Sequence, residues 1–190
     1  MGRAWEGLLA QLVEQRWGRL VGHAMLVATS RDEAQDLVQE ALVATFGSRA
    51  RFTTIAEAEQ YVRRAIVSRS VDEHRRRTRE RAAVGRLAGH PAPVTEVVPR
   101  GLGADVVRAL AGLTPRERAC VVLRQVEDLS VHETASVLGL SEGAVKRYTS
   151  DGLRRLDAAL GTRTDDPESV PVRPVAATPT STSTNGGEAR

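Results

Sequence analysis

The sequence predicts an all-α fold, in which two small helical domains are joined by a flexible linker. Apolar residues recur at the three- and four-residue spacing of amphipathic helices along most of the chain. Four helix-start signals precede these periodic regions, and a stretch rich in proline and glycine separates them. Hydrophobic residues make up 41% of the 190 residues but aromatic residues only 3%, which suits helices packed through Leu, Val and Ala. No segment shows the period-two alternation of a strand.

The helix-start signals are capping boxes, in which a Ser or Thr is followed three residues later by Glu. In such a box each side chain satisfies a backbone N–H of the first helical turn. Pro115 strengthens the third box, because proline is favoured at the first helical position. The four boxes are Ser30/Glu33, Thr54/Glu57, Thr114/Glu117 and Ser130/Glu133.

Apolar stripes at helical spacing follow these starts, and an earlier helix begins at Trp5 and is expected to continue toward Ala28. The stripes predict which face of each helix is buried. They comprise Ala34, Leu37, Val38, Ala41 and Leu42; then Ala58, Tyr61, Val62, Ala65 and Ile66; then Ala119, Val122, Leu123 and Val126.

Composition divides the chain into four parts. Three prolines and three glycines interrupt the periodicity before residue 104, and the C-terminal residues are rich in Pro, Ser, Thr and Gly without any period. We therefore expect a helical domain at 1–81, a linker at 82–104, a second helical domain at 105–161 and a disordered tail at 162–190.

The second domain contains a predicted helix-turn-helix. A short helix from Val131 to Leu138 is followed by a turn at Gly139 and by Ser141 as the next N-cap. In this motif the second helix enters the major groove of DNA. With Val145 at the centre of the buried face, Tyr148, Thr149, Gly152, Leu156 and Ala159 fall on the same side. The opposite side carries Gly143, Arg147, Ser150 and Arg154, with Lys146 on its flank. A plain pair of amphipathic helices with a solvated face is the alternative interpretation.

Charge gives a mixed indication of an anionic partner. The formal net charge is +3, yet residues 105–161 have eight basic and eight acidic side chains. Residues 63–81 hold eight arginines and three acids, which indicates either a solubilising helix end or contact with the DNA backbone. Opposite the apolar stripe of 31–46 lie polar side chains that are either solvated or form a docking face for a basic partner. These are Asp32, Asp36, Gln39 and Glu40.

Signals of other functional classes are absent from the sequence. Cys120 is the single cysteine and lies in an apolar run, where a small buried side chain is expected rather than a reactive thiol. The four histidines have no metal-site spacing, and no nucleophile–base pair or phosphate-binding glycine loop is visible. Without a signal peptide or an apolar run long enough to cross a membrane, the sequence predicts a cytoplasmic protein that is not an enzyme and has no metal or cofactor.

Three stretches, in order, resemble the bacterial extracytoplasmic-function sigma factors. The first resembles the family's segment that binds the β′ clamp helices of RNA polymerase, the second the segment that opens and reads the −10 element, and the third the −35-reading domain. "TSDGL" looks closest to the actinobacterial SigE-like subgroup. The three stretches are DEAQDLVQEALVATF, YVRRAIVSRSVDEHRRR and LTPRERACVVLRQVEDLSVHETASVLGLSEGAVKRYTSDGLRRL.

The resemblance implies three sets of site residues and the partners that they contact. The partners would be core RNA polymerase, through its β′ clamp helices and β flap, promoter DNA and an anti-sigma factor, with no membrane. Polymerase contact falls to Asp36, Gln39 and Glu40. The resemblance assigns reading of the −10 element to Arg64, Ser68, Asp72, Arg75 and Arg76. It assigns reading of the −35 element to Gly143, Lys146, Arg147, Ser150 and Arg154.

Four positions depart from the family's pattern. Ser68 stands where the family commonly has Asn, and Ala144 where Thr is frequent. Tyr148 and Asp151 lie near positions that are often arginine. These differences concern the promoter that is read and not the class of protein. Two rival functions remain at this stage: a helix-turn-helix regulator that binds an operator as a dimer, and an adaptor whose helices bind a partner without DNA.

Overall fold

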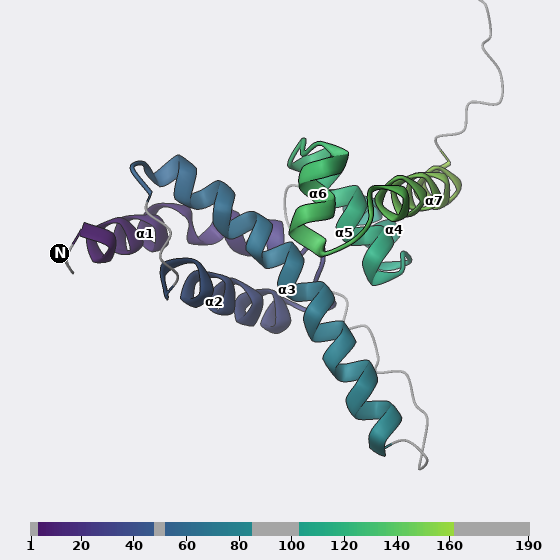
Figure 1. The fold of residues 1–190 in the computed structure, drawn as a ribbon, viewed down its shortest axis with the longest axis horizontal. Helices are drawn as coiled ribbons and strands as arrows, with labels where there is room; N and C mark the ends of the chain where they lie inside the picture. Colours follow the sequence, from purple (N-terminus) through teal and green to yellow (C-terminus); the bar gives the residue numbers. More distant parts are fainter. Residues whose placement is uncertain (1–3, 48–51, 85–102, 162–190) are drawn as a thin grey trace, which may run out of the picture.

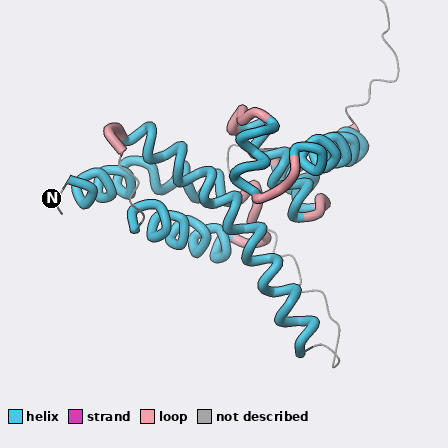
Figure 2. Tube along the Cα trace, in the orientation of Figure 1, coloured by secondary structure: helices cyan, strands magenta, loops and turns pink. Residues whose placement is uncertain are grey.

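The computed structural model describes residues 4–47, 52–84 and 103–161. Within these ranges the secondary structure is helical and contains no strand, which confirms the predicted fold class (Figures 1 and 2). Of the predicted linker and tail, residues 85–102 and 162–190 lie outside the described ranges. The elements are α1 (Ala4–Ala24), α2 (Arg31–Gly47), α3 (Ile55–Val84), α4 (Ala104–Ala111), α5 (Pro115–Val121), the π-helical turn η1 (Val122–Val126), α6 (Val131–Leu138) and α7 (Glu142–Leu160).

Helices α1, α2 and α3 pack against one another. All five residues of the stripe predicted for α2 are buried, and the following Thr45 is buried with them. Helix α1 ends at Ala24, short of the predicted Ala28. The chain tightens there into a turn, in which the N–H of Leu26 bonds to the carbonyl of His23 at 3.0 Å.

The four predicted capping boxes form in two different ways. Those at Thr114 and Ser130 are complete, with hydrogen bonds in both directions. At α2 and α3 the Ser30 and Thr54 hydroxyls accept from the expected N–H groups, but the glutamate reaches one residue further back. There it accepts from both the backbone N–H and the hydroxyl of Thr29 or Thr53.

The stripe predicted for α5 is wrong at its last position. Ala119, Val122 and Leu123 are buried, but Val126 is 52% exposed. The cause is η1, where the N–H of Glu127 bonds to the carbonyl of Val122 five residues earlier. A π-helical turn holds more residues than an α-helical turn, so residues after it leave the phase that a 3.6-residue period predicts.

The helix-turn-helix has the predicted boundaries. Helix α6 ends at Leu138, and Gly139 adopts the left-handed conformation, with φ of 60°, which a glycine takes without strain. The Ser141 side chain then accepts a hydrogen bond from the N–H of Ala144 and so begins α7. Helix α7 packs on α5 at Gly152, where an added Cβ would lie 2.7 Å from Cγ2 of Val121.

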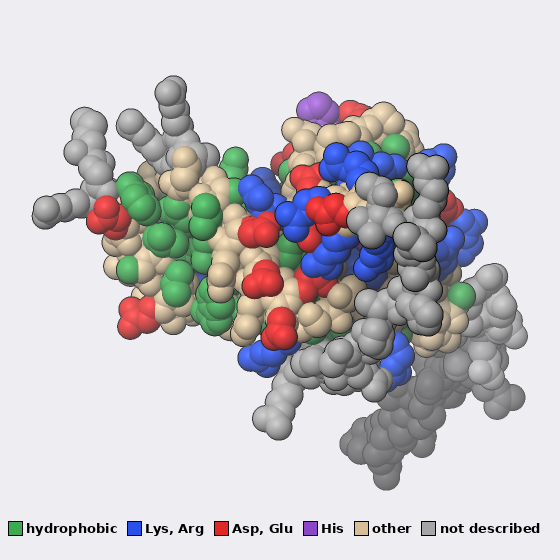
Figure 3. Space-filling view, turned by 90° about the horizontal axis from the view of Figure 1, so that it is seen from below, with side chains coloured by type: hydrophobic (Ala, Val, Ile, Leu, Met, Phe, Trp, Pro, Cys, Tyr) green, Lys and Arg blue, Asp and Glu red, His purple; other side chains and the backbone are tan. Residues whose placement is uncertain are grey.

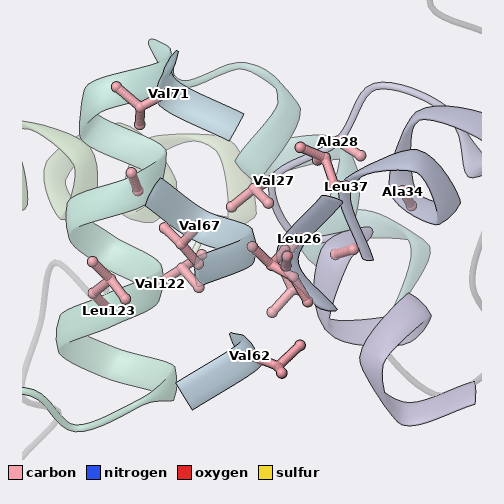
Figure 4. Close-up of a cluster of buried hydrophobic side chains, with 14 of the residues drawn as sticks. Leu26, Val27, Ala28, Ala34, Leu37, Val62, Val67, Val71, Val122 and Leu123 are labelled. Carbon is pink, nitrogen blue, oxygen red and sulfur yellow. The ribbon is translucent and has the colours of Figure 1, made fainter. Parts of the chain in front are cut away.

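The two helical groups, α1–α3 and α4–α7, meet along α3. One continuous apolar cluster contains side chains from both groups, including Val67 of α3 and Val122 of η1 (Figure 4). The second half of α3 extends beyond α2 (Figure 1) and carries the exposed arginines of this helix, Arg75, Arg76, Arg79 and Arg81. The first half of α3 is thus enclosed between the two groups, whereas its second half projects from them.

Candidate nucleic-acid and partner-binding surfaces

The exposed face of α7 holds the five side chains predicted to contact DNA. Gly143, Lys146, Arg147, Ser150 and Arg154 are all exposed. On the opposite side Val145 is fully buried and Gly152 is buried against α5. Next to the exposed face lies a groove of about 620 Å³, which Arg124 and Lys146 help to line. Arg154 is paired with Asp151 one turn earlier, so this acid competes for the arginine.

Tyr148 is not the core side chain that the periodicity predicts. It is half-buried, and its hydroxyl accepts a hydrogen bond from Nη1 of Arg116 at 3.2 Å. The guanidinium of Arg147 lies 5.0 Å from the centre of its ring, a cation–π distance. Hydrogen bonds from Arg116, and then from Arg147, lower the pKa of Tyr148. The ring therefore supports Arg147, and Arg116 is a surface residue that sequence reasoning missed.

The predicted −10 residues on α3 lie in two different environments. Arg64 and Ser68 are half-buried where α3 faces the α4–α7 group, and the Ser68 hydroxyl donates to the carbonyl of Val137 at 3.2 Å. Asp72, Arg75 and Arg76 are exposed further along the helix. The structure thus brings these five residues onto one helix but not onto one open surface.

Ion pairs divide the arginine-rich run into structural and exposed members. Arg77 pairs with Glu33 of α2 at 2.7 Å and with Glu73 at 2.8 Å. Arg63 pairs with Glu59 at 3.0 Å and with Glu127 at 3.5 Å. These arginines join α3 to other parts of the fold, whereas Arg75 and Arg76 pair with acids on α3 itself and stay exposed for contact with an anion. The exposed arginines of the run are Arg75, Arg76, Arg79 and Arg81.

A basic pocket that the sequence did not indicate lies between α3 and the α4–α7 group. It has a volume of about 810 Å³, and its lining includes Arg75 and Arg79 of α3, Arg116 of α5 and Tyr148 of α7. Figure 3 shows Lys and Arg side chains gathered at this end of the molecule and hydrophobic side chains at the other end. No sequence signal could have found the pocket, because its lining comes from three separate helices.

The acidic face of α2 is exposed as the sequence predicts. Asp36, Gln39 and Glu40 all lie on the surface. Glu40 also forms an ion pair with Arg69 of α3 at 3.7 Å. The face can therefore meet a basic partner, and Glu40 is in addition tied to its own fold.

Other features of the described ranges bear on chemistry. Cys120 is fully buried, as expected, and burial raises the pKa of its thiol to about 11. Within residues 4–47, 52–84 and 103–161, no three His, Cys, Asp or Glu side chains are grouped to hold a metal ion. None of the helices in these ranges has the length and apolar character needed to span a membrane.

Each helical group matches a family model, and the two models describe two regions of the sigma-70 factors. Residues 12–80 match sigma-70 region 2, and residues 104–156 match sigma-70 region 4. The chain is 34% identical over 158 residues to the RNA polymerase sigma-E factor of Streptomyces coelicolor, which covers 80% of this chain and 86% of that protein. It is 28% identical over 159 residues to the ECF RNA polymerase sigma factor SigM of Mycobacterium tuberculosis, covering 80% of this chain and 76% of that one.

A solved structure has a similar fold. The sigma factor RpoE of Bartonella quintana, crystallised in complex with the anti-sigma factor NepR, aligns with a TM-score of 0.59 and 20% identity. The alignment covers 81% of this chain and 97% of that chain. A regulator built only on a helix-turn-helix does not account for the match of residues 12–80 to sigma-70 region 2. An adaptor that makes no contact with DNA does not account for the match of residues 104–156 to sigma-70 region 4. The chain therefore belongs to the extracytoplasmic-function sigma factors of the SigE-like subgroup, non-enzymatic initiation factors that bind core RNA polymerase and direct it to promoter DNA.

Proposed function

We propose that the two helical groups divide promoter recognition between them. The domain at 1–81 holds core polymerase through Asp36, Gln39 and Glu40 of α2, and α3 reads the −10 element. The domain at 105–161 places α7 in the major groove of the −35 element. Residues 82–104 then act as the linker between the two, and residues 162–190 as a tail outside them.

The observation that carries this proposal is the exposed face of α7. A capped N-terminus at Ser141 and a packed opposite side at Val145 fix the helix, while Lys146 and Arg147 point away from the protein. Side chains near the N-terminus of such a helix are the ones that meet base edges. Arginine is suited to guanine, because its guanidinium can donate to O6 and N7 together.

The −10 residues would work on single-stranded DNA. Unstacking a base costs a few kcal/mol, which contacts to the base and the phosphates must offset. Arg75 and Arg76 are exposed on the projecting half of α3 and are suited to phosphate contacts. Arg64 and Ser68 lie nearer the enclosed half and are suited to the base itself.

The proposal also includes a location in the cell and a regulatory partner. The absence of a membrane-spanning helix in the described ranges fits a cytoplasmic location, where core polymerase is found. The anti-sigma factor bound to the structurally similar RpoE supports a regulator of the same kind for this chain.

In vitro transcription tests the proposal most directly. The purified full-length chain is added to core polymerase with fragmented genomic DNA as template, and the transcript starts are mapped. We expect new starts that depend on the chain and share sequence near −10 and −35. Starts that are the same with and without the chain would contradict the proposal.

A further inference from the structure

The basic pocket between α3 and the α4–α7 group has the dimensions of a small-molecule site. Its volume of about 810 Å³ lies within the range of about 300–1,000 Å³ that is usual for ligand pockets. Side chains from three helices line it, which makes it a hollow between elements and not the exposed face of one helix. We call it the arginine pocket, after its lining residues Arg75 and Arg79 of α3 and Arg116 of α5.

The lining of the arginine pocket carries an excess of positive charge. Three arginines and one acid, Asp72, leave a net charge of +2 when His74 is counted as neutral. Asp72 lies 3.8 Å from Arg75, and both side chains are exposed, so this pair holds the arginine weakly. Lys and Arg side chains gather at the same end of the molecule in Figure 3. A hollow lined by one sign of charge concentrates ions of the opposite sign.

Arg79 and Arg116 have no ion-pair partner among the described residues. Nε of Arg79 donates to the carbonyl of Arg75 at 3.3 Å, and Nη1 of Arg116 donates to the Tyr148 hydroxyl at 3.2 Å. Both acceptors are neutral, whereas Arg77 of the same helix α3 pairs with two glutamates. The charges of Arg79 and Arg116 therefore stay uncompensated in the fold, and both guanidiniums can donate to an anion in the pocket.

Tyr148 experiences the same positive surroundings. Hydrogen bonds from Arg116, and then from Arg147, lower the pKa of its hydroxyl, because they favour the charged phenolate. The wall of the pocket that α7 provides thus favours a negative charge beside Arg116.

A phosphate monoester matches the charge of the arginine pocket. At pH 7 such a group carries a charge of about −1.5 to −2, which offsets the +2 of the lining. Arginine suits phosphate, because its planar fork donates parallel hydrogen bonds to two oxygens. A carboxylate, or one phosphodiester of a nucleic-acid backbone, carries a single negative charge and would leave half of the positive charge uncompensated.

The size of the pocket calls for more than a phosphate ion. Five atoms, each of about the size of a water molecule at about 30 Å³, occupy about 150 Å³. The remaining volume is bordered by the apolar side chains of Val71 and Pro115 and by Tyr148. This part of the lining suits the sugar and the flat base of a nucleotide, since a base offers an apolar face.

We propose that the arginine pocket binds a nucleotide, whose phosphate monoester lies between Arg79 and Arg116 and whose base lies against Val71 and Pro115. Neither promoter DNA nor core polymerase takes part, so the inference is independent of the proposed function. Because the lining comes from both helical groups, a bound nucleotide joins them and should raise the thermal midpoint of the chain.

Calorimetric titration of the full-length protein tests the site. The probes are AMP, GMP, CMP and UMP, with inorganic phosphate and adenosine as comparisons, in a buffer without phosphate. We expect at least one of the four nucleotides to bind with a dissociation constant below about 1 mM. It should bind at least about tenfold more tightly than inorganic phosphate or adenosine, because each of these provides only part of the contacts.

Two substitutions remove the arginines that lack an ion-pair partner. Arg79→Gln and Arg116→Gln each lose charge-assisted hydrogen bonds to the phosphate, so each should weaken nucleotide binding at least about tenfold, and the double variant about 100-fold. The matched control is Arg31→Gln with Arg81→Gln, which makes the same change of charge at exposed positions outside the lining and should bind as the wild type does. Arg75 is kept, because it belongs to the proposed −10 set. Circular dichroism checks the helix content of every variant.

A single-stranded DNA oligonucleotide of random sequence separates a nucleotide site from a strand-binding site. Its phosphodiesters respond to the total charge of the surface. We therefore expect its affinity to fall by the same factor in the double variant and in the matched control, whereas nucleotide affinity falls in the double variant alone.

Three results would overturn the inference. The first is that none of the four nucleotides binds the wild type below about 1 mM, or that inorganic phosphate binds as tightly as they do. The second is a folded Arg79→Gln or Arg116→Gln that binds the nucleotide as the wild type does. The third is a double variant in which only the affinity for the oligonucleotide falls, which would make the pocket a strand-binding site. None of these results affects the proposed function, which fails instead if the chain supports no promoter-specific transcription.

Discussion

Arg147 and Arg154 lie on the same exposed face of α7 but should contribute differently to binding. Arg147 is near the N-terminus of the helix and lies over the Tyr148 ring, so it can present a fixed guanidinium to a base. Arg147→Ala should relax discrimination at one or two −35 positions by about 1–3 kcal/mol. Arg154→Ala should weaken binding to all −35 sequences by a similar factor. It should also lower the slope of log affinity against log salt concentration by about one. A library of −35 variants, read at several salt concentrations, measures both effects.

The position of Tyr148 refines this expectation. Because the ring supports Arg147 and is only half-buried, Tyr148→Ala should alter the −35 preference in the same direction as Arg147→Ala while changing the thermal midpoint little. Tyr148→Phe keeps the ring and loses the bond from Arg116, so it should stay close to the wild type. If Tyr148→Ala lost much stability and kept the wild-type −35 preference, Tyr148 would act as a core side chain and not as a support for Arg147.

His23 makes the stability of the fold depend on pH. Burial, and then the positive charge of Arg63, lower its pKa from 6.5 to about 4. Below pH 6.5 the unfolded chain takes up a proton that the folded chain does not, so stability is present above pH 6.5 and is lost as the pH falls toward 4. Between pH 7 and pH 5 the loss should be about 2 kcal/mol.

Urea unfolding at pH 7, 6 and 5 measures this dependence, with His23→Gln as the comparison. The groups that face His23 are Arg63 of α3 and Glu127 after η1. The raised pKa of Glu127 acts in the opposite direction, since its stabilising effect is present at low pH and lost as the pH rises through that pKa. The difference in unfolding free energy between the two proteins isolates the contribution of His23. If that free energy changed with pH equally in both proteins, the imidazole would not be the cause of the pH dependence.

At the scale of elements, Gly152 sets how closely α7 approaches α5. An added Cβ would lie 2.7 Å from Val121 and 3.4 Å from Glu117, so one helix must move. Gly152→Ala should therefore cost about 1–3 kcal/mol through overpacking, less the gain in helix propensity. Gly143→Ala in the same helix meets nothing within 4 Å and should be neutral or stabilising by up to about 1 kcal/mol. Thermal unfolding of the two variants compares them, and equal midpoints would contradict the close packing.

The acidic face of α2 gives a second prediction at this scale. Reversal of Asp36 and Glu40 to Lys should weaken binding to core polymerase and leave the helix content unchanged, because both side chains are exposed. Glu40 also pairs with Arg69, so Asp36→Lys alone is the cleaner variant. A pull-down with core polymerase measures the effect. Binding equal to that of the wild type would mean that the face is merely solvated.

At the scale of the whole molecule, we expect residues 162–190 to be dispensable. Their composition has too little apolar surface to offset the entropy of ordering them. A chain that ends after Gly161 should bind promoters and support transcription as the full chain does. Lost activity in that truncation, with helix content intact, would assign the tail a function.

The sequence by itself determined the helices and most of their buried faces. Helix starts at Ser130 and Ser141 depend on hydrogen bonds that close within three residues, and Gly139 provides the turn between them. The stripe of α2 is buried throughout, because a helical period carries its face along the whole element. The exposed face of α7 could be predicted for the same reason.

Only the tertiary structure decided where these faces meet. Ser68 and Val137 are 69 residues apart, and no local pattern pairs them. The same holds for Tyr148 with Arg116 and for Glu127 with Arg63. Periodicity says that a face is buried but not against which partner, since apolar burial is non-directional. The meeting of the two groups along α3 arises from packing between segments that are distant in the sequence.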